Sequence, residues 1–263
     1  MENILPDSLK LFRLDDRLIV VTGASDGIGR TFAEAFARAG ARLVLVSRRR
    51  EQLEVVQHAI KSSGGRAEVV PADVSKLADI HTLADAVREF AKDNDDRLVL
   101  VNNAGFGFTK SALEITESDW DALLDTHVKG TFFCSQKIGR AMIERGYGKI
   151  INMSSAWAAA TETGKSAYCA AKAAVTHLTA ALSTEWAPLG VRVNALAPTT
   201  TMTDFTANNM AANPIRADRL RSRIKLGRFA KPVDLVGAAV FLASDASDFV
   251  TGQTLFVDGG FTT

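Results

Sequence analysis

Short apolar runs alternate with longer amphipathic stretches from residue 17 to the end of the chain. The runs are rich in Val, Leu and Ile and lack the strict alternation of half-exposed strands, so they predict strands covered on both faces. The stretches between them, such as 30–39, 52–62 and 77–92, carry apolar residues at helical spacing and end at glycine or a polar cluster. The predicted strands are 17–22, 41–46, 66–70, 97–101, 149–153, 191–196 and 254–257.

Strands that alternate with helices predict an α/β fold, here a Rossmann-like, doubly wound, parallel seven-stranded sheet with helices on both faces in three α/β/α layers. Because no linker or longer repeat interrupts the pattern, we predict one domain over residues 1–263, with 1–13 as an N-terminal extension. Segment 199–226 has no strand pattern and is rich in Asn and Arg. We predict that it forms a mostly helical, mobile substrate lid.

The composition is that of a globular protein with balanced charge. Of the 263 residues, 31 are Lys or Arg and 30 are Asp or Glu, which gives a formal net charge of +1. This balance argues against a nucleic-acid or anionic-membrane partner. The N-terminus lacks the apolar core of a signal peptide, and no apolar run reaches the roughly 18 residues of a membrane span. We therefore expect a cytoplasmic protein, and because the histidines lack ligand spacing we expect no metal.

Three glycines, Gly23, Gly27 and Gly29, lie between the first predicted strand and the helix that follows it. Glycines at such a turn allow the backbone to approach a pyrophosphate closely, while the helix N-terminus offers free N–H groups and a positive dipole end. The GxxxGxG spacing differs from the GxGxxG fingerprint, and an ordinary tight turn is the alternative. The order of strand, glycine turn and helix favours a dinucleotide site.

The residues after the second predicted strand bear on which dinucleotide is bound. An acid there would hydrogen-bond the 2′-hydroxyl of NAD, whereas an arginine would accept the 2′-phosphate of NADP. The chain has Ser47 followed by Arg48, Arg49 and Arg50, and no acid. Arg48 is placed for a bidentate phosphate contact, while Arg49 and Arg50 are interpreted as solvated residues at the start of a helix. The charge of Asp26 opposes a 2′-phosphate, but the balance favours NADP(H) over NAD(H).

Tyr168 and Lys172 are four residues apart in an Ala-rich helical stretch, so their side chains project from the same face. An ammonium beside a phenol favours the phenolate, which lowers the phenol pKa of about 10 toward neutral pH. Tyr168 is then able to act as a general acid or base. A Tyr/Lys pair is also a common surface feature of helices. Whether this pair is catalytic therefore depends on the other motifs of the chain.

Motifs along nearly the whole chain support a chemical role for this pair. They are the TGxxxGxG turn at 22–29, Asp73 and Val74 after the third strand, Asn102, Asn103, Ala104 and Gly105 after the fourth, Ser155 after the fifth, the Tyr168xxxLys172 pair, Asn194 and Pro198 around the sixth, and the segments 251–253 and 257–260. With these motifs the chain resembles the short-chain dehydrogenase/reductase (SDR) family from about residue 14 to 260. By general pattern it is similar to 3-oxoacyl-carrier-protein reductases and gluconate 5-dehydrogenases.

The resemblance implies an enzyme that transfers hydride and interconverts a ketone or aldehyde and an alcohol. Ser155 is expected to polarise the substrate carbonyl, Tyr168 to donate the proton, and Lys172 to lower the Tyr168 pKa and hold the nicotinamide ribose. Ser155 is chosen over Ser154 because the twelve residues between Ser155 and Tyr168 match the family spacing. The favoured substrates are 3-oxoacyl thioesters or sugar acids.

The resemblance also implies which residues contact the cofactor and the substrate. The expected cofactor contacts are Gly23, Ser25, Asp26, Gly27, Ile28, Gly29, Ser47, Arg48, Asp73, Val74, Asn103, Ala104, Gly105, Tyr168, Lys172, Pro198, Thr199, Thr201 and Thr203. Asp73 and Val74 are assigned to the adenine, and Thr201 and Thr203 to the carboxamide. The expected substrate pocket consists of Phe106, Phe108, Ser155, Trp157, Thr161 and Met202. A homotetramer is the common assembly of the family, with a dimer as the alternative.

Two positions depart from the family pattern. His127 occupies the place of an Asn whose main-chain carbonyl completes a proton relay to the lysine, and Thr199 follows Pro198 where the family has Gly. His127 either preserves the relay through its own carbonyl, as a tolerated substitution, or joins it with an imidazole of pKa near 6.5. These departures leave a second function open, a catalytically impaired NADP(H)-binding regulator or scaffold on the same fold.

Overall fold

The computed structural model of the chain describes residues 9–92 and 97–263. Within these residues seven strands form one parallel sheet in the order β3-β2-β1-β4-β5-β6-β7. This order confirms the predicted doubly wound, Rossmann-like fold, because the direction of winding reverses between β1 and β4. The strands are β1 (Arg17–Thr22), β2 (Arg42–Ser47), β3 (Arg66–Pro71), β4 (Arg97–Asn102), β5 (Gly148–Met153), β6 (Val191–Pro198) and β7 (Thr254–Val257).

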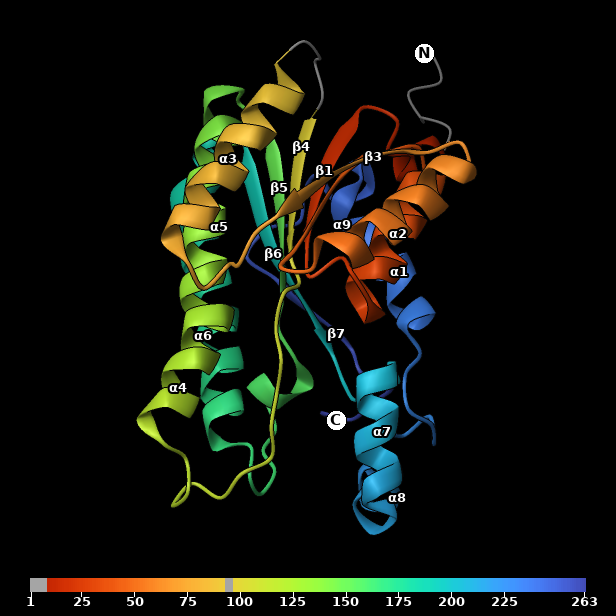
Figure 1. Cartoon of the computed structure of the whole chain (residues 1–263), viewed down its shortest axis with the longest axis vertical. Coiled ribbons are helices and arrows are strands. Elements are labelled where there is room, and N and C mark those ends of the chain that lie inside the picture. Colours follow the sequence, from red (N-terminus) through yellow and green to blue (C-terminus); the bar gives the residue numbers. More distant parts are fainter. Residues whose placement is uncertain (1–8, 93–96) are drawn as a thin grey trace, which may run out of the picture.

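Helices cover both faces of the sheet and complete the three predicted layers (Figure 1). On one face lie α1, α2 and α9, and on the other lie α3, α5 and α6. The pair α7 and α8 lies beyond the carboxyl end of β6. The helices are α1 (Gly27–Arg38), α2 (Arg50–Ser62), α3 (Leu77–Ala91), α4 (Glu117–Leu124), α5 (Gly130–Glu144), α6 (Ser166–Trp186), α7 (Asp204–Ala212), α8 (Pro214–Arg223) and α9 (Val236–Ala243).

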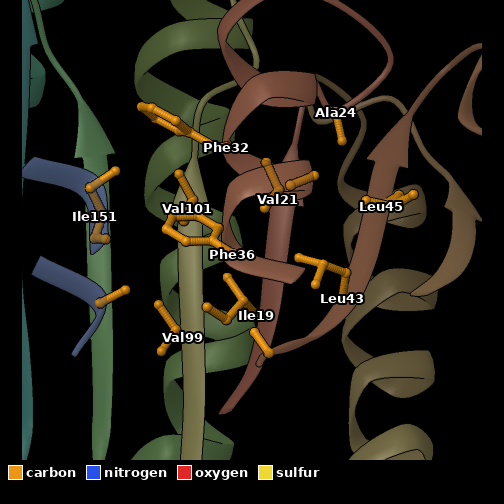
Figure 2. Packing of buried hydrophobic residues seen from close by; sticks show 14 of the residues in the cluster. Ile19, Val21, Ala24, Phe32, Phe36, Leu43, Leu45, Val99, Val101 and Ile151 are labelled. Carbon is orange, nitrogen blue, oxygen red and sulfur yellow. The ribbon is translucent and has the colours of Figure 1, made fainter. Parts of the chain in front are cut away.

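The sheet divides the core into two apolar layers, because successive side chains of a strand point to opposite faces. In the first layer Ile19 and Val21 of β1 pack against α1, where the ring centroids of Phe32 and Phe36 are 5.9 Å apart (Figure 2). The second layer packs the other face against α3, α5 and α6. Full burial of a large apolar side chain is worth about 1.5–3 kcal/mol, so these layers hold the carboxyl ends of the strands in fixed positions.

The two outer strands, β3 and β7, are less covered than the sequence predicts. In β7, Leu255 and Phe256 are each 37% exposed. An outer strand has one neighbouring strand and lies at the rim of the helical layers. The expectation of cover on both faces therefore holds for the inner strands and is wrong at the edges.

Segment 199–226 is mostly helical, as predicted, and its helices are α7 and α8. Met210 of α7 and Leu220 of α8 pack with Trp157 and Phe261 in a small apolar cluster beyond the sheet. Of the N-terminal extension at 1–13, residues 1–8 lie outside the described residues, and Lys10–Phe12 forms a short 3-10 turn. No helix in the described ranges is long and apolar enough to cross a membrane.

Candidate active site

The glycine turn after β1 is too tight for side chains. Gly23 and Gly27 have φ values of 67° and 53°, a backbone region that favours glycine. A Cβ at Gly29 would lie 2.2 Å from the carbonyl oxygen of Gly23. The first N–H groups of α1 lack acceptors within the helix and lie at this turn. Their position fits the pyrophosphate of a dinucleotide.

The segment after β4 is tied to the same turn by hydrogen bonds. Thr22 Oγ1 accepts from the backbone N–H groups of Asn103 and Ala104, at 3.0 Å each. Asn103 Nδ2 donates to the carbonyl oxygen of Thr22 at 3.0 Å. A Cβ at Gly105 would lie 2.3 Å from Cε1 of His127. The segment therefore connects the turn to His127, and Gly105 leaves room for the imidazole.

The end of β2 contains an ion pair that sequence reasoning missed. The guanidinium of Arg49 donates to Asp26 Oδ2 at 2.5 Å and to Ser25 Oγ at 3.1 Å. Arg49 is exposed at the start of α2, as interpreted, and it also pairs with Asp26, which the turn brings beside it. Arg49 balances the charge of Asp26 and leaves the exposed Arg48 without a contribution from that acid.

Asp73 lies across from Arg48 at the end of β3. Burial alone would raise the pKa of Asp73, but hydrogen bonds from Ser75 and the charge of Arg48 hold that pKa below its usual value. Asp73 Oδ1 accepts from the Ser75 hydroxyl at 2.7 Å. An ionised acid and a nearby arginine therefore border the place expected for the adenosine.

Three further cofactor candidates are held mainly by the fold. Ile28 packs against the first apolar layer and Val74 lies in the second. Ser47 Oγ accepts from the backbone N–H of Arg49 at 3.3 Å. These residues shape the walls around the ends of β2 and β3.

The segment after β6 also approaches the glycine turn, at Gly27. Thr203 Cγ2 would lie 3.0 Å from a Cβ at Gly27, and Thr203 Oγ1 accepts from the backbone N–H of Thr206 at the start of α7. Thr201 Oγ1 donates to the carbonyl oxygen of Thr199 at 3.0 Å. Thr199 Oγ1 is buried and has no hydrogen-bond partner within the described part of the chain. An unpaired buried hydroxyl beside the turn fits a site built for a polar ligand.

Ser154 and Ser155 follow β5 and have different surroundings. Ser154 faces α6, with its Oγ 2.6 Å from Thr176 Oγ1. Ser155 Oγ accepts from the backbone N–H of Trp157 at 3.2 Å and donates to the carbonyl oxygen of Pro198 at 3.4 Å. Burial raises the pKa of Tyr168, and the Ser155 hydroxyl acts to lower it. Of the two serines, Ser155 is therefore the one linked to the expected proton donor.

Lys172 is buried one turn after Tyr168 on α6. Its Nζ donates to the carbonyl oxygen of Met153 at 2.6 Å and lies 5.6 Å from the centroid of the Tyr168 ring. Burial lowers the pKa of Lys172 to about 7 and raises the pKa of Tyr168 to about 12, although the Ser155 hydrogen bond acts to lower the latter. In this state desolvation of the phenolate is therefore the largest influence on the Tyr168 pKa, and the effect of Lys172 on that pKa stays a prediction.

His127 lies in a π-helical turn, Asp125–Lys129, which connects α4 to α5. Its side chain is 3% exposed, and its Nε2 lies 2.7 Å from the carbonyl oxygen of Phe106. Nε2 also lies 3.2 Å from the backbone N–H of Phe106, so both main-chain polar groups of Phe106 hold the imidazole in place. Burial first, and the charge of Lys172 second, lower the pKa of His127 to about 3. The imidazole is neutral at physiological pH, which contradicts the interpretation of a relay group with a pKa near 6.5.

The expected substrate residues divide into two groups. Phe106 is 42% exposed, and its ring centroid lies 6.5 Å from that of Phe108. Trp157 is buried under the lid with its ring 5.0 Å from Phe261, and Met202 packs against the same cluster. Thr161 is exposed, and its carbonyl oxygen accepts from Arg223 at 3.4 Å. The two phenylalanines thus lie together on the segment after β4, and Trp157 packs against α7 and α8.

Two charged residues near the site, Glu162 and Lys165, were not identified from the sequence. The Glu162 carboxylate accepts two hydrogen bonds from Arg216, at 3.0 and 2.8 Å, and one from Arg219 at 3.0 Å. These bonds connect the loop before α6 to α8. Lys165 precedes Tyr168 by three residues, so helical spacing alone would have placed it beside the tyrosine.

The glycine turn, the serine after β5 and the Tyr168/Lys172 pair lie at one edge of a doubly wound sheet, an arrangement typical of nicotinamide-dependent oxidoreductases. Residues 23–262 match a family model described as enoyl-(acyl carrier protein) reductase. The chain belongs to the SDR family and is an oxidoreductase that acts on CH–OH and C=O groups. The resemblance found in the sequence is confirmed.

Relatives in this family act on sugar acids and polyols. The chain is 40% identical to gluconate 5-dehydrogenase of Gluconobacter oxydans over 252 residues, 96% of this chain and 97% of the relative. It is 34% identical to NAD-dependent glycerol dehydrogenase of Listeria innocua over 253 residues, 96% of each. A crystal structure of gluconate 5-dehydrogenase from Burkholderia cenocepacia in complex with NADP and tartrate superposes with a TM-score of 0.91 at 37% identity, covering 97% of this chain and 98% of that one.

Proposed function

We propose that the protein interconverts a sugar acid and the corresponding keto acid at a secondary carbon, with NADP(H) as cofactor. The observation that carries this proposal is the convergence of Ser155, Tyr168 and Lys172 at the carboxyl end of β5. Of the two substrate classes expected from the sequence, sugar acids are supported by the gluconate 5-dehydrogenase from Gluconobacter oxydans.

Arg48 supports NADP(H) as the preferred cofactor. It is exposed at the end of β2, and the pairing of Arg49 with Asp26 removes the charge that would oppose a 2′-phosphate. The glycine turn provides the backbone approach for the pyrophosphate, and the relative from Burkholderia cenocepacia binds NADP. Because the relative from Listeria innocua is NAD-dependent, similarity to relatives does not choose between NAD and NADP. The choice of cofactor in this protein is therefore argued from the local charge at Arg48.

Tyr168 is the proposed general acid for carbonyl reduction. Because burial holds its pKa near 12, the phenol keeps its proton at neutral pH and is able to donate it to the carbonyl oxygen. Ser155 replaces its long bond to Pro198 with one to the same carbonyl oxygen, which polarises the carbonyl. When bound, the nicotinamide supplies the hydride to the carbonyl carbon, or accepts it in the reverse reaction.

Lys172 is proposed to stabilise the phenolate that remains after the proton is donated. Its Nζ is close to the Tyr168 ring, and the carbonyl oxygen of Met153 fixes its position. An ammonium there also fits a hydrogen bond to the nicotinamide ribose. His127, neutral and in edge contact with the Tyr168 ring, orients the tyrosine and takes no part in proton transfer through its side chain.

A carbonyl panel tests this function against the alternative of an impaired regulator. NADPH oxidation is measured with 5-keto-gluconate, a 3-oxoacyl thioester and a cyclic ketone, in the wild type and in Tyr168→Phe. We expect turnover of the keto acid and a loss of at least a hundredfold in kcat in the variant. NADPH binding without any Tyr168-dependent reduction would favour the regulator.

We further propose a cytoplasmic homotetramer. A depression lies between α4, the π-helical turn at Asp125–Lys129, α5 and α6. Its apolar lining consists of Leu124, Val128, Phe132, Phe133 and Leu178. Together with the exposed residues of β7, this surface offers a second copy of the chain an apolar contact. Light scattering of the purified protein tests this assembly, and a monomer at micromolar concentration would contradict it.

A further inference from the structure

Lys165, Tyr168 and Lys172 lie on one face of the helical segment that forms α6, at positions i, i+3 and i+7. The Nζ of Lys165 is 5.7 Å from the centroid of the Tyr168 ring, and that of Lys172 is 5.6 Å away. The two lysines precede and follow the tyrosine along the helix. Lys172 faces the end of β5 through Met153, whereas Lys165 lies before the tyrosine and contacts the segment after β4.

Lys165 contacts the segment that follows β4. Its Nζ donates to the carbonyl oxygen of Phe108 at 2.8 Å and would lie 4.0 Å from a Cβ at Gly107. Phe106 and Phe108 lie on either side of Gly107, and Phe106 is exposed to solvent. Lys165 therefore contacts the segment that carries the expected substrate residues Phe106 and Phe108, one helical turn from the proton donor.

Lys165 forms no ion pair among the described residues. Within residues 9–92 and 97–263 no carboxylate lies within 4.0 Å of its Nζ. The nearby Glu162 is already engaged by Arg216 and Arg219, and its side chain is 3% exposed. One carbonyl oxygen satisfies one of the three N–H donors of an ammonium, so two remain for another acceptor.

The charges around Lys165 are predominantly positive. Arg216, Arg219 and Arg223 of α8 face the loop before α6, and Glu162 is the acid among them. Burial first, and the charge of Arg216 second, lower the pKa of Lys165 below its usual value. A cation that is partly desolvated and repelled by its neighbours is stabilised when an anion binds beside it.

We propose that Lys165 binds the carboxylate of the substrate and gives the enzyme its preference for sugar acids over neutral polyols. The inference rests on the proposed function and specifies the group that recognises the acid. An ammonium with two free donors provides charge-assisted hydrogen bonds to a carboxylate, while a hydroxymethyl group in its place gains much less. Lys165 would thus bind the carboxylate of gluconate, which sorbitol replaces with a hydroxymethyl group.

The first test compares a matched acid and polyol. The ratio of kcat/KM for gluconate to kcat/KM for sorbitol is measured with NADP⁺ in the wild type, Lys165→Met, Lys165→Gln and Lys165→Arg. We expect both neutral variants to lower this ratio about tenfold, mainly through the KM for gluconate, and Lys165→Arg to retain most of it. Lys110→Met is the control, because Lys110 lies on the neighbouring loop and is paired with Asp119. An equal loss on both substrates would show a structural role and overturn the proposal.

A second test does not depend on turnover. Tartrate and threitol are four-carbon molecules with the same central diol. Both ends of tartrate are carboxylates, and both ends of threitol are hydroxymethyl groups. The binding of each to the NADP-loaded protein is measured by calorimetry. We expect the wild type to bind tartrate at least tenfold more tightly than threitol, and Lys165→Met to lose this difference. If no sugar is turned over but this pattern holds, the proposed function fails and the role of Lys165 stands. Equal tartrate binding by wild type and Lys165→Met, or no binding to the wild type, overturns the role of Lys165.

Discussion

The His127 imidazole and the Tyr168 ring form a T-shaped contact, with centroids 5.6 Å apart and planes at 87°. The π-helical turn at Asp125–Lys129 places the histidine there, and Gly105 leaves the space that the ring occupies. A neutral imidazole in this position supports the proton donor by packing. Its Nδ1 is buried without a hydrogen-bond partner among the described residues, so this atom contributes no hydrogen bond to the fold.

Acid stability tests the neutral state of His127. In the folded protein its pKa is about 3, and in the unfolded chain it takes the usual value near 6.5. Stability is therefore unaffected above pH 6.5 and falls as the pH decreases toward 3, because only the unfolded state binds the proton. We expect His127→Asn to reduce the fall in unfolding free energy between pH 6.5 and 4.5 by about 2 kcal/mol, measured by urea denaturation. His58→Asn, at an exposed position, is the control, and identical slopes for His127→Asn and wild type would contradict the assignment.

Lys172 is predicted to reduce stability at neutral pH while it serves the chemistry. Its folded-state pKa of about 7 lies below the usual 10.5, so burial of the ammonium costs stability below pH 7, and this cost disappears as the pH rises from 7 to 10.5. Lys172→Met leaves the carbonyl of Met153 without its donor, which offsets part of the gain. We expect the melting temperature at pH 6 to rise by about 2–4 °C, with turnover lost. A melting temperature that falls equally at pH 6 and pH 10 would show that the lysine stabilises the fold.

The Arg49–Asp26 pair gives a test of cofactor preference. Arg48→Ala removes the proposed phosphate contact, and we expect the KM for NADPH to rise about tenfold or more with little change for NADH. Arg49→Ala frees the charge of Asp26 beside the 2′-phosphate, so it weakens NADPH as well. Adding Asp26→Asn to Arg49→Ala should restore most of the loss, which a double-mutant cycle measures. Equal effects of Arg48→Ala on both cofactors would remove the argument for NADP(H).

Glu162 is predicted to fasten the lid. Glu162→Gln replaces the carboxylate that Arg216 and Arg219 share, and α8 then loses its charged contact with the loop before α6. We expect the KM for the sugar substrate to rise about fivefold, with NADPH binding unchanged, because the glycine turn lies on another part of the sheet edge. Limited proteolysis of segment 199–226 should be faster in this variant. Unchanged proteolysis together with an unchanged KM would show that the lid is held by its apolar cluster alone.

The strands could be predicted because their apolar runs depend on local sequence. Each predicted strand overlaps an observed one, and the error at β3 and β7 arises because local sequence does not reveal which strands lie at the edge. The mostly helical character of 199–226 was also readable from its pattern. Family motifs placed Ser155, Tyr168 and Lys172 at one site, since the carboxyl ends of parallel strands meet there.

Features that depend on contacts distant in sequence could not be predicted in the same way. Arg49 and Asp26 are 23 residues apart, and Glu162 and Arg216 are 54 apart, so their pairing requires the folded chain. The pKa of Tyr168 was expected to fall because a lysine lies four residues away. It rises because burial, which residue spacing does not report, is the largest cause of the shift.

Transfer of deuterium from NADPH labelled at C4 to a keto sugar acid tests the central claim most directly. The label is followed by mass spectrometry of the product, with wild type and Tyr168→Phe at equal NADPH saturation. We predict deuterium at the new carbinol carbon of gluconate formed from 5-keto-gluconate by the wild type, and a rate at least a hundredfold lower in Tyr168→Phe. Product without deuterium, or transfer at the same rate in both proteins, would contradict hydride transfer assisted by Tyr168.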